Sequence, residues 1–390
     1  MPPTTTTTLS PLSIAGKVVG PEGEPVAQAR VEILGATTTT GSDGFFALEA
    51  DGPGTLTVTK PGWTSGVHEW EADTAFAHIS IQPIVVRGLR VGAGAAGDDA
   101  LFTRLLALVE TTAVNAFVFD TKLEGGTVLY DTSVQAAHDA GAVDVFYDPL
   151  ERLAQAGEVG LYTITRIAVF EDSYRVAYRP EEKLAGIWVD PRIEATWDYN
   201  IALAVEACEL GFDEIQFDYV RFPSGRTAEV SGQLSLTQAQ RVAAVVGFLS
   251  RARETLNPMG CAISAAIFGI VVSVDDDQGL GQRPEEISRQ VDAVSPMVYP
   301  SHYSTGWLGL TDPNEHPYEV TADAIDDALP RMAGSAALRP WLQAFWWSND
   351  QIRRSIQAAE DRGVGWILWN VRSDFDAAAI PTDEELSPSG

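Results

Sequence analysis

Between residues 85 and 370, eight strand-like segments alternate with helical segments, and this alternation limits the folds open to the chain. The strand-like segments are short and apolar, at residues 85–91, 114–120, 161–170, 214–220, 261–269, 291–299, 339–347 and 364–370. Helical patterns separate them, for example at residues 197–211 and 236–256. Eight strand–helix units of roughly 36 residues each predict a (β/α)8 TIM barrel over residues 85–380.

An open, doubly wound parallel sheet is the alternative fold for such a pattern. That fold normally begins with a glycine-rich phosphate-binding turn, which residues 92–97 (GAGAAG) resemble. The second strand does end in an acidic residue, Asp120, but the basic Lys122 follows it, which is not the pattern of a ribose-binding acid. The barrel is therefore the predicted architecture of this α/β protein.

The fourth strand is the most informative because its two faces differ. One face carries carboxylates and an amide, from Glu214, Gln216 and Asp218. The other face is apolar and carries Ile215, Phe217 and Tyr219. We expect the apolar face to meet the helices and the polar face to point into the barrel. Asp218 is then the last inward residue, at the end of the barrel where catalytic groups lie.

A different pattern precedes the barrel. Residues 12–84 contain short alternating segments separated by turns such as Pro-Glu-Gly-Glu-Pro, which predicts a small all-β sandwich. The segment GKVVGPEGEPVAQARVEILG resembles the carboxypeptidase regulatory-like, transthyretin-type module, which is usually accessory. We interpret residues 1–11 as a Thr/Pro-rich linker and residues 381–390 as a C-terminal tail.

The charge of the chain restricts its partners. With 54 acidic and 26 basic residues, the formal net charge is −28, which repels nucleic acid and anionic membranes. No apolar run approaches the roughly 18 residues of a membrane span. The charge suits a neutral substrate and a salty or extracellular setting, and solubility alone also explains it. Because a Thr/Pro-rich start is typical after an export signal or lipid anchor, we expect an extracellular or cell-surface protein.

The sequence has two cysteines, Cys208 and Cys261. Two cysteines do not make a disulfide scaffold, and they argue against a cysteine metal site. Cys208 ends a helix and Cys261 begins the next strand, so we expect both near the bottom of the barrel. We predict two buried free thiols, with a single disulfide as the alternative.

Polar and aromatic residues at the ends of the barrel strands form a candidate pocket. They are Asp120, Lys122, Arg166, Asp218, Arg221, Tyr299, His302, Trp347, Trp369 and Asn370. Sugar rings stack on aromatic side chains, and sugar hydroxyls pair with Asp, Asn and Arg. The loop after the fifth strand adds three aspartates, at residues 275–277, and is long enough to fold over the barrel mouth. These residue types at one end of a barrel predict a carbohydrate site.

Hydrolysis of a glycosidic bond requires two carboxyl groups. We assign Asp218 as the nucleophile, kept ionised by Arg166. Asp277 is the first candidate for the general acid and Asp276 the second, because a loop carboxyl that closes over a sugar is desolvated and retains its proton. The sequence has no zinc-binding histidine pattern and no G-x-S-x-G motif, so we expect neither a metal site nor another cofactor.

Each assignment has a structural alternative. Asp218 would then cap its loop or pair with Arg221, and Asp120 would pair with Lys122. Residues 275–277 would form a solvated loop or bind Ca²⁺. Tryptophans such as Trp347 and Trp369 would pack in the core, because strand alternation directs some of them toward the helices.

The barrel resembles the bacterial putative glycosyl hydrolase domain family in several segments. Examples are NAFVFDTKLEGGTVLYD, FDEIQFDYVRFPSG, AIFGIVVSVDDDQGLGQ and LRPWLQAFWW. The resemblance covers nearly all of residues 85–375 and implies a retaining glycosidase-like site with Asp218 as nucleophile. It favours Asp276 and Asp277 over Asp275 as the loop carboxylates. Residues 92–97 depart from the aromatic-bearing first loop of that family and leave one side of the pocket open.

We therefore predict a glycoside hydrolase that cleaves O-glycosidic bonds in a poly- or oligosaccharide by a retaining, two-carboxylate mechanism. A non-catalytic carbohydrate-binding barrel is the first alternative. The second is a Schiff-base aldolase or lyase that uses Lys122, although a nearby carboxylate such as Asp120 raises a lysine pKa rather than lowering it.

Overall fold

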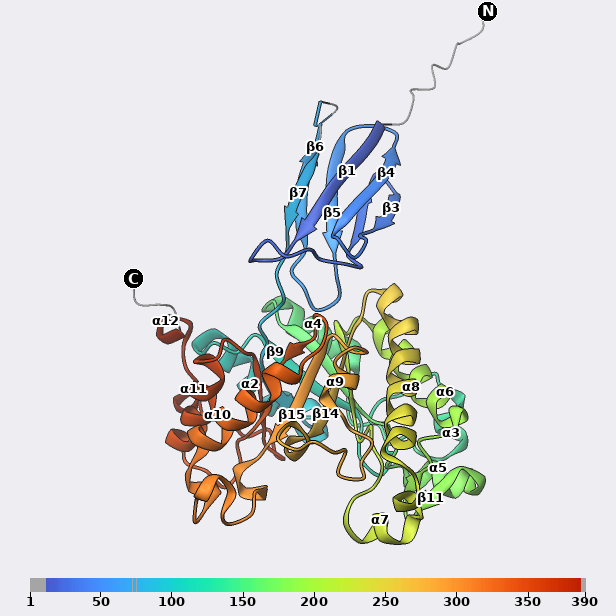
Figure 1. Ribbon diagram of the computed structural model, residues 1–390, viewed down its shortest axis with the longest axis vertical. Helices are drawn as coiled ribbons and strands as arrows, with labels where there is room; N and C mark the ends of the chain where they lie inside the picture. The colour runs from blue at the N-terminus through green and yellow to red at the C-terminus, as the bar shows by residue number, and fades with distance from the viewer. Residues whose placement is uncertain (1–11, 72, 75, 387–390) are drawn as a thin grey trace, which may run out of the picture. The chain divides into compact units, whose positions relative to one another are not determined.

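The computed structural model describes residues 12–71, 73–74 and 76–386 of the chain. The predicted linker at residues 1–11 lies outside the described residues. The chain divides into two units, residues 1–84 and residues 85–390 (Figure 1). Each unit has a hydrophobic core of its own.

The first unit is an all-β sandwich, as the sequence predicts. Its strands are β1 (Leu12–Val19), β2 (Arg30–Ile33), β3 (Ala36–Thr39), β4 (Phe45–Ala50), β5 (Gly54–Thr59), β6 (Gly66–Trp70) and β7 (Ala77–Ser80). They form two sheets, ordered β4-β1-β7 and β3-β2-β5-β6, that share one core. The alternation of β1 places Ile14 and Val18 in this core, where both are fully buried.

The second unit is a closed barrel of parallel strands, which confirms the predicted fold. Its strands, within the described residues, are β8 (Arg87–Val91), β9 (Ala116–Lys122), β10 (Tyr162–Ala168), β13 (Glu214–Asp218), β14 (Ala262–Phe268), β15 (Ala293–Val298), β16 (Ala337–Leu338), β17 (Trp341–Gln343) and β18 (Trp366–Trp369). Both β16 and β17 pair with β15 and together make one position of the eight. Pairing of β14 with β15 closes the sheet.

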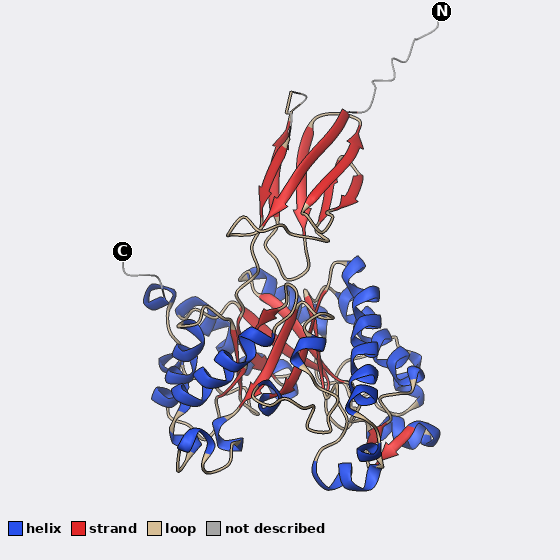
Figure 2. Cartoon of the chain, in the orientation of Figure 1, coloured by secondary structure: helices blue, strands red, loops and turns tan. Residues whose placement is uncertain are grey.

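Helices surround the barrel (Figure 2). The longer helices are α2 (Asp99–Thr111), α4 (Pro149–Glu158), α6 (Glu194–Leu210), α8 (Gln238–Leu256), α10 (Pro317–Ala328) and α11 (Asn349–Glu360). Shorter elements are α1 (Ala93–Ala96), α3 (Gln135–Asp139), α5 (Ser173–Tyr178), α7 (Gly225–Ser231), α9 (Pro284–Ile287), β11 (Lys183–Ala185) and β12 (Trp188–Val189). Within the predicted C-terminal tail, α12 (Asp383–Leu386) is held by an ion pair between its Glu385 and Arg353 of α11.

The two faces of β13 lie as their polarity predicts. On the outer face, Phe217 packs on Phe248 of α8, with ring centroids 4.9 Å apart. On the inner face, the amide of Gln216 donates to Ser264 and Ser295 at 3.3 Å. Its oxygen accepts a 2.9 Å hydrogen bond from the indole N–H of Trp341. The polar side chains of the barrel interior therefore satisfy one another, which is what burial of polar groups requires.

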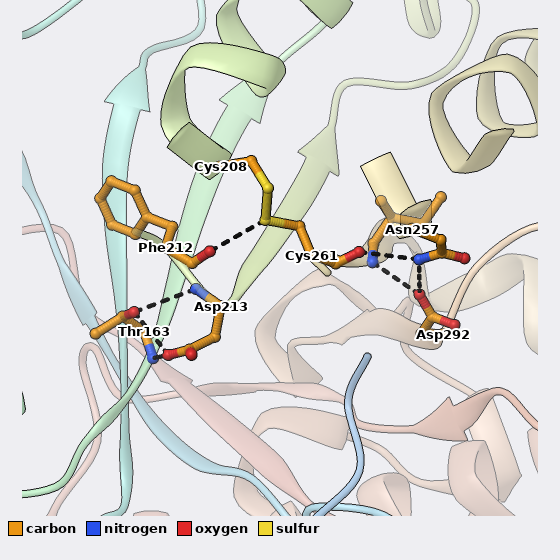
Figure 3. The surroundings of a disulfide bond; sticks show 8 residues. Thr163, Cys208, Phe212, Asp213, Asn257, Cys261 and Asp292 are labelled. Atoms are coloured by element: carbon orange, nitrogen blue, oxygen red, sulfur yellow. Dashed lines mark hydrogen bonds between the residues drawn. A yellow bond between two sulfur atoms is a disulfide. The ribbon is translucent and has the colours of Figure 1, made fainter. Parts of the chain in front are cut away.

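Cys208 and Cys261 form a disulfide, so the prediction of two free thiols is wrong. Cys208 lies in the last turn of α6, and Cys261 directly precedes β14 (Figure 3). Because α6 leads directly into β13, and β13 pairs with β14, the two cysteines meet at the bottom of the barrel. Their Cα atoms are 6.0 Å apart, within the range that a disulfide requires.

Candidate active site

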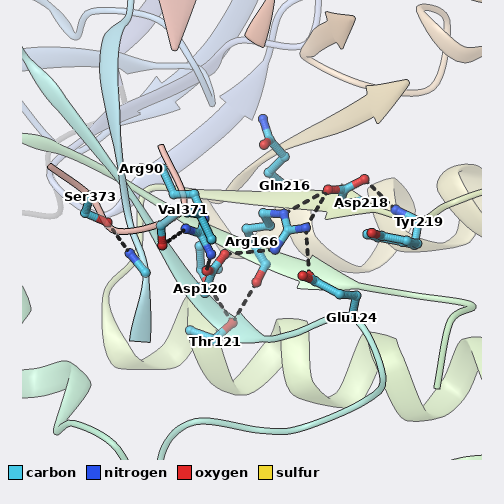
Figure 4. Close-up of polar contacts among 12 residues, drawn as sticks. Arg90, Asp120, Thr121, Glu124, Arg166, Gln216, Asp218, Tyr219, Val371 and Ser373 are labelled. Atoms are coloured by element: carbon cyan, nitrogen blue, oxygen red, sulfur yellow. Dashed lines mark hydrogen bonds and ion pairs between the residues drawn. The ribbon is translucent and has the colours of Figure 1, made fainter. Parts of the chain in front are cut away.

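The buried guanidinium of Arg166 binds several carboxylates at the C-terminal end of the barrel strands (Figure 4). Its Nε and Nη2 atoms each lie 2.8 Å from Oδ2 of Asp218. Its Nη1 lies 2.9 Å from Oδ1 of Asp120, and Nη2 lies 3.2 Å from Glu124. Burial opposes the charge of Arg166, but these carboxylates outweigh it and raise the pKa well above its usual value. Arg166 is therefore a permanent cation that orients Asp218.

Asp218 is the last residue of β13, and the chain turns sharply after it. Its Oδ1 accepts a 2.6 Å hydrogen bond from the backbone N–H of Tyr219. Tyr219 has a φ of 49°, a conformation that non-glycine residues seldom adopt. The turn places Tyr219 beside Asp218 at the strand end, whereas strand alternation alone assigns this residue to the helix-facing side.

A cavity of about 560 Å³ opens beside Asp218. Six of the predicted site residues line it: Arg166, Asp218, Arg221, Tyr299, His302 and Trp369. Other residues of its wall are not among the predicted site residues, including Tyr219, Phe268, Met297, Tyr303 and Trp307. The signal for Tyr303 and Trp307 is the long aromatic segment that follows β15, where short 3-10 helices at Pro300–His302 and Trp307–Gly309 turn the chain across the barrel end.

The titratable groups of the cavity wall divide into charged and neutral ones. Burial lowers the pKa of His302, so its imidazole is neutral at neutral pH. Burial also raises the pKa of Tyr299 well above its usual value, with a contribution from Asp218. The cations of the wall are therefore Arg166 and Arg221, and Asp218 is its one carboxylate among the described residues.

Asp120 supports the cavity from behind, because it is fully buried and does not line the wall. Its second oxygen pairs with Arg90 of β8. The guanidinium carbons of Arg90 and Arg166 lie 4.2 and 4.9 Å from the ring centroid of Trp369. Asp120 thus positions two arginines, and these in turn hold an aromatic ring of the cavity.

Lys122 lies outside the cavity, unlike the expectation from the sequence. The register of β9 against β10 shifts by one residue after the Arg166–Asp120 pair, so that Lys122 lies opposite Ile167. Such a bulge reverses the alternation, so that Lys122 turns away from the lumen. Its Nζ lies 2.8 Å from Asp172 and 3.0 Å from Asn200 of α6. Buried among these partners, Lys122 is inaccessible to a carbonyl substrate, which argues against the aldolase alternative.

The two general-acid candidates also lie away from the cavity wall. Asp277 forms two hydrogen bonds, of 2.7 and 2.8 Å, with Arg241 of α8. Burial favours protonation of Asp277, but Arg241 and the backbone N–H groups of Gly281 and Gly279 outweigh it and lower the pKa. Asp276 is exposed and accepts a hydrogen bond from Gln278. An ionised, paired carboxylate has no proton to give, so Asp277 does not have the properties of a general acid.

Trp347 and Asn370 form hydrogen bonds within the loops that follow β17 and β18. The indole N–H of Trp347 donates to the side-chain oxygen of Asn314 at 2.9 Å. Asn370 donates to the backbone oxygen of Ala344 at 2.7 Å, and its side-chain oxygen accepts from the N–H of Arg372. Both residues line a second cavity, of about 520 Å³.

Glu171, three residues beyond β10, was not among the predicted catalytic residues. Its backbone bridges that of Trp188, whose ring lies 4.7 Å from the guanidinium of Arg221. Burial raises the pKa of Glu171; Arg221 opposes this, and the negative charges of Glu124 and Asp218 reinforce it. Glu171 is thus a half-buried carboxyl with a raised pKa beside Arg221, in contrast to Asp277, whose pKa is lowered.

Other kinds of site find no support in the part of the chain that the structure describes. No group of three or more His, Cys, Asp or Glu side chains there is placed to hold a metal ion. Over the same residues, no helix is both long enough and apolar enough to cross a membrane.

Residues 88–375 match the profile of a protein family described as "Putative glycosyl hydrolase domain". The chain belongs to this family. Residues 13–81 match the carboxypeptidase regulatory-like domain, which is the domain that the sequence of the sandwich resembles. The glycosyl hydrolase domain includes Asp218 and the whole cavity wall. No curated protein matches the chain.

Several solved structures are similar to this glycosyl hydrolase domain. A hypothetical protein from Ruminiclostridium thermocellum ATCC 27405 is 30% identical, with 45% of this chain and 96% of that chain covered and a TM-score of 0.39. The PgaB (BpsB) glycoside hydrolase domain from Bordetella bronchiseptica is 13% identical, with coverages of 74% and 95% and a TM-score of 0.55. The spore cortex-lytic enzyme SleL from Bacillus megaterium QM B1551 is 12% identical, with coverages of 76% and 73% and a TM-score of 0.49. The likeness to PgaB shows a shared fold.

Proposed function

We propose that the barrel hydrolyses O-glycosidic bonds in a poly- or oligosaccharide, with Asp218 as the nucleophile of a retaining mechanism. The observation that carries this proposal is a carboxylate at the C-terminal end of a barrel strand, in the wall of a cavity rich in aromatic rings. Membership of the glycosyl hydrolase domain family supports the reaction class.

The hydrogen bonds of Asp218 suit a nucleophile. The Nε–H of Arg166 donates to Oδ2, and Nη2 of Arg166 lies in ion-pair contact with the same oxygen, so Arg166 fixes the plane of the carboxylate. Oδ1 accepts one hydrogen bond, from the backbone of Tyr219. A carboxylate oxygen has two lone-pair sites, so Oδ1 retains one that has no donor among the described residues. We assign Oδ1 as the atom that attacks the anomeric carbon.

Glu171 is our candidate for the general acid, in place of Asp276 and Asp277. It does not line the cavity wall itself, but it interacts electrostatically with Arg221 and Asp218, which do. Its raised pKa supports this role, because a general acid must hold its proton until the leaving oxygen departs. In the first step, Oδ1 of Asp218 bonds to the anomeric carbon while Glu171 protonates the departing oxygen. In the second step, the Glu171 carboxylate takes a proton from water, which displaces Asp218 and frees the sugar.

The Asp218→Asn variant tests the proposal. An amide is almost the same size as the carboxylate but a poor nucleophile, so kcat should fall on the order of 10⁴-fold while oligosaccharide binding persists. Release of reducing ends from a polysaccharide panel measures turnover, and calorimetry measures binding. Asp276→Asn is the matched control and should leave kcat unchanged. Turnover that survives Asp218→Asn would exclude Asp218 as the nucleophile.

A non-catalytic carbohydrate-binding barrel is the second candidate function. The observation that favours it is that Asp218 is the sole carboxylate among the described residues that line the cavity. Such a protein would bind oligosaccharides without releasing reducing ends, and Asp218→Asn would change neither property in kind. The same two measurements therefore separate the two functions.

We also propose that the protein acts outside the cytoplasm. The disulfide between Cys208 and Cys261 supports an oxidising compartment, because disulfides persist mainly in secreted and surface proteins. An extracellular location also gives the barrel access to polysaccharides. Reaction of intact cells with a thiol-specific label before and after reduction, followed by isolation of this chain, tests the location.

A further inference from the structure

Arg221 differs from the other buried arginines in the part of the chain that the structure describes. Seven arginines are buried there, and six form ion pairs with carboxylates: Arg90, Arg152, Arg166, Arg175, Arg241 and Arg339. Arg221 is 6% exposed and has no carboxylate of the described residues within ion-pair distance. Since a buried charge is normally compensated by a partner, the missing anion at Arg221 needs an explanation.

The guanidinium of Arg221 is held rigidly in spite of this missing partner. Its carbon lies 4.3 Å from the ring centroid of Phe268, 4.7 Å from that of Trp188 and 5.1 Å from that of Tyr219. Its Nη1 donates a 3.0 Å hydrogen bond to the backbone oxygen of Phe222. The aromatic rings favour the cation, and among the described residues the other N–H groups have no acceptor. A rigid fork with free donors is pre-organised for an anion.

The free donors belong to the same cavity as Asp218. Arg221, Tyr219 and Phe268 all line its wall. The other cation of the wall, Arg166, is compensated by Asp218, Asp120 and Glu124. Arg221 is therefore the cation of the wall that has no ion-pair partner among the described residues. Burial lowers its pKa, and Asp218 opposes this only through longer-range electrostatics.

We propose that Arg221 binds an anionic substituent on the sugar, a carboxylate or a sulfate ester, and that the preferred substrate is an acidic glycan. This inference rests on the proposed function of the cavity. A guanidinium donates two parallel N–H bonds to such a group, and the flanking rings of Tyr219 and Phe268 offer surfaces for the sugar ring. The net charge of −28 favours a neutral substrate at long range. Salt screens charges beyond roughly 8 Å under physiological conditions, so the local cation decides the preference.

The bound anion also has a consequence for the proposed acid. In the free protein, the charge of Arg221 partly opposes the raised pKa of Glu171. An anion that neutralises Arg221 removes this opposition, so that the Glu171 proton is held more tightly when an acidic sugar is in place. Binding and protonation of the acid would then be coupled through one arginine.

The test compares acidic oligosaccharides with neutral forms of the same chains. The probes are oligosaccharides of polygalacturonate, alginate, hyaluronan and carrageenan, together with their carboxyl-reduced or desulfated derivatives. Calorimetry on the full-length Asp218→Asn protein measures binding without turnover. We expect at least one acidic probe to bind roughly 10- to 100-fold more tightly than its neutral form, as for hydrogen bonds to a charged group. The reduced and desulfated arms identify which anion is bound. Equal affinity for all acidic and neutral pairs would overturn the inference.

Arg221→Gln, made in the same background, should remove this difference between the acidic and the neutral forms. Arg221→Met keeps the apolar stem between the aromatic rings and removes the charge. Because the charge has no partner in the free protein, Tm of Arg221→Met should be unchanged or higher. Arg241→Met is the matched control and should lower Tm, since it deprives Asp277 of its partner. A lowered Tm in Arg221→Met with the acidic preference intact would show a structural role instead.

The two proposals fail in different ways. If the protein prefers acidic oligosaccharides through Arg221 but the wild type shows no turnover, the inference of an acidic ligand stands and the proposed hydrolase activity is wrong. If the protein hydrolyses neutral glycans and Arg221→Gln does not affect this activity, the proposed hydrolase activity stands and the inference of an acidic substrate is wrong.

Discussion

The raised pKa of Glu171 determines how a variant at this residue should behave. Burial is the largest cause of the shift, so the proton is retained at a pH where an exposed glutamate is ionised. Glu171→Gln should abolish turnover of natural oligosaccharides and remove the alkaline limb of the kcat/KM profile. A nitrophenyl glycoside of the same sugar should still form the glycosyl-enzyme, because nitrophenolate departs without a proton. Equal losses for both substrates would assign the proton to another group.

Stability gives an independent check on Glu171. For a carboxyl whose folded pKa exceeds its unfolded pKa, the folded state binds more protons, and the free energy of unfolding falls as pH rises through that range. Glu171→Gln removes this cost, so the variant should be at least as stable as the wild type at pH 7. Chemical denaturation at pH 5 and pH 7 measures the effect.

Asp277 and its neighbour Asp276 should respond in opposite ways to substitution. The Asp277 side chain is 2% exposed and pairs with Arg241, so Asp277→Ala should destabilise the fold by about 3 kcal/mol. Asp276 is exposed, and Asp276→Ala should change stability by less than about 0.5 kcal/mol. Because the pKa of Asp277 is lowered, its contribution is present above the unfolded pKa and is lost as pH falls through the folded pKa. Equal stability of the two variants at pH 7 would contradict a structural role for the ion pair.

The sequence predicted the cavity residues that follow strand alternation and failed for those that depend on a partner or a turn. Asp218, Arg166 and Trp369 lie at strand ends and line the cavity. The pairing of Asp277 with Arg241 joins a loop to a helix 36 residues away, which no local pattern reveals. The alternative prediction, that residues 275–277 form a solvated loop, is confirmed for the exposed Asp276 and is wrong for the buried Asp277.

A single bulge in β9 changes the directions in which the side chains of Asp120 and Lys122 point. Alternation predicts that Asp120 and Lys122 share the inner face, as they would in a regular strand. The register shift against β10 keeps Asp120 in the lumen and sends Lys122 to a pair with Asp172 outside it. Bulges cluster beside active sites, and their position depends on the partner strand, which a single segment of sequence does not contain.

The disulfide between α6 and β14 should stabilise the barrel without affecting the cavity. It joins residues 53 positions apart, and loop entropy for that span corresponds to about 4 kcal/mol. Because the bond lies at the bottom of the barrel, reduction should lower the denaturation midpoint and leave oligosaccharide affinity under native conditions unchanged. The Cys208→Ser/Cys261→Ser double variant, with and without reductant, controls for other effects of the reductant. An unchanged midpoint in the double variant would show that the bond adds no stability.

At the scale of the whole molecule, the architecture follows from two periodicities in one chain. Alternating segments with period two and tight turns give the sandwich, and the repeated strand–helix unit gives the barrel. The boundary falls at residues 84 and 85, where the pattern of the sequence changes. Each of the eight strand–helix units has the same sequence pattern. An error in predicting one strand therefore does not change the fold that the other units indicate. The site has no such redundancy, which explains why the fold was easier to predict than the acid.

The two separate cores predict that the barrel is autonomous. Residues 85–390 contain the cavity, the disulfide and every helix of the described barrel, and their core does not include residues of the sandwich. A protein truncated to residues 85–390 should therefore fold, unfold in one cooperative transition and bind oligosaccharides with the affinity of the full chain. If turnover is detected, kcat on short oligosaccharides should also be unchanged, whereas any loss confined to long polysaccharides would assign substrate capture to the sandwich. Calorimetry of the full chain should show the transition of the fragment together with a second one from residues 12–84. A fragment that is insoluble or melts without cooperativity would show that the barrel depends on the sandwich for its stability.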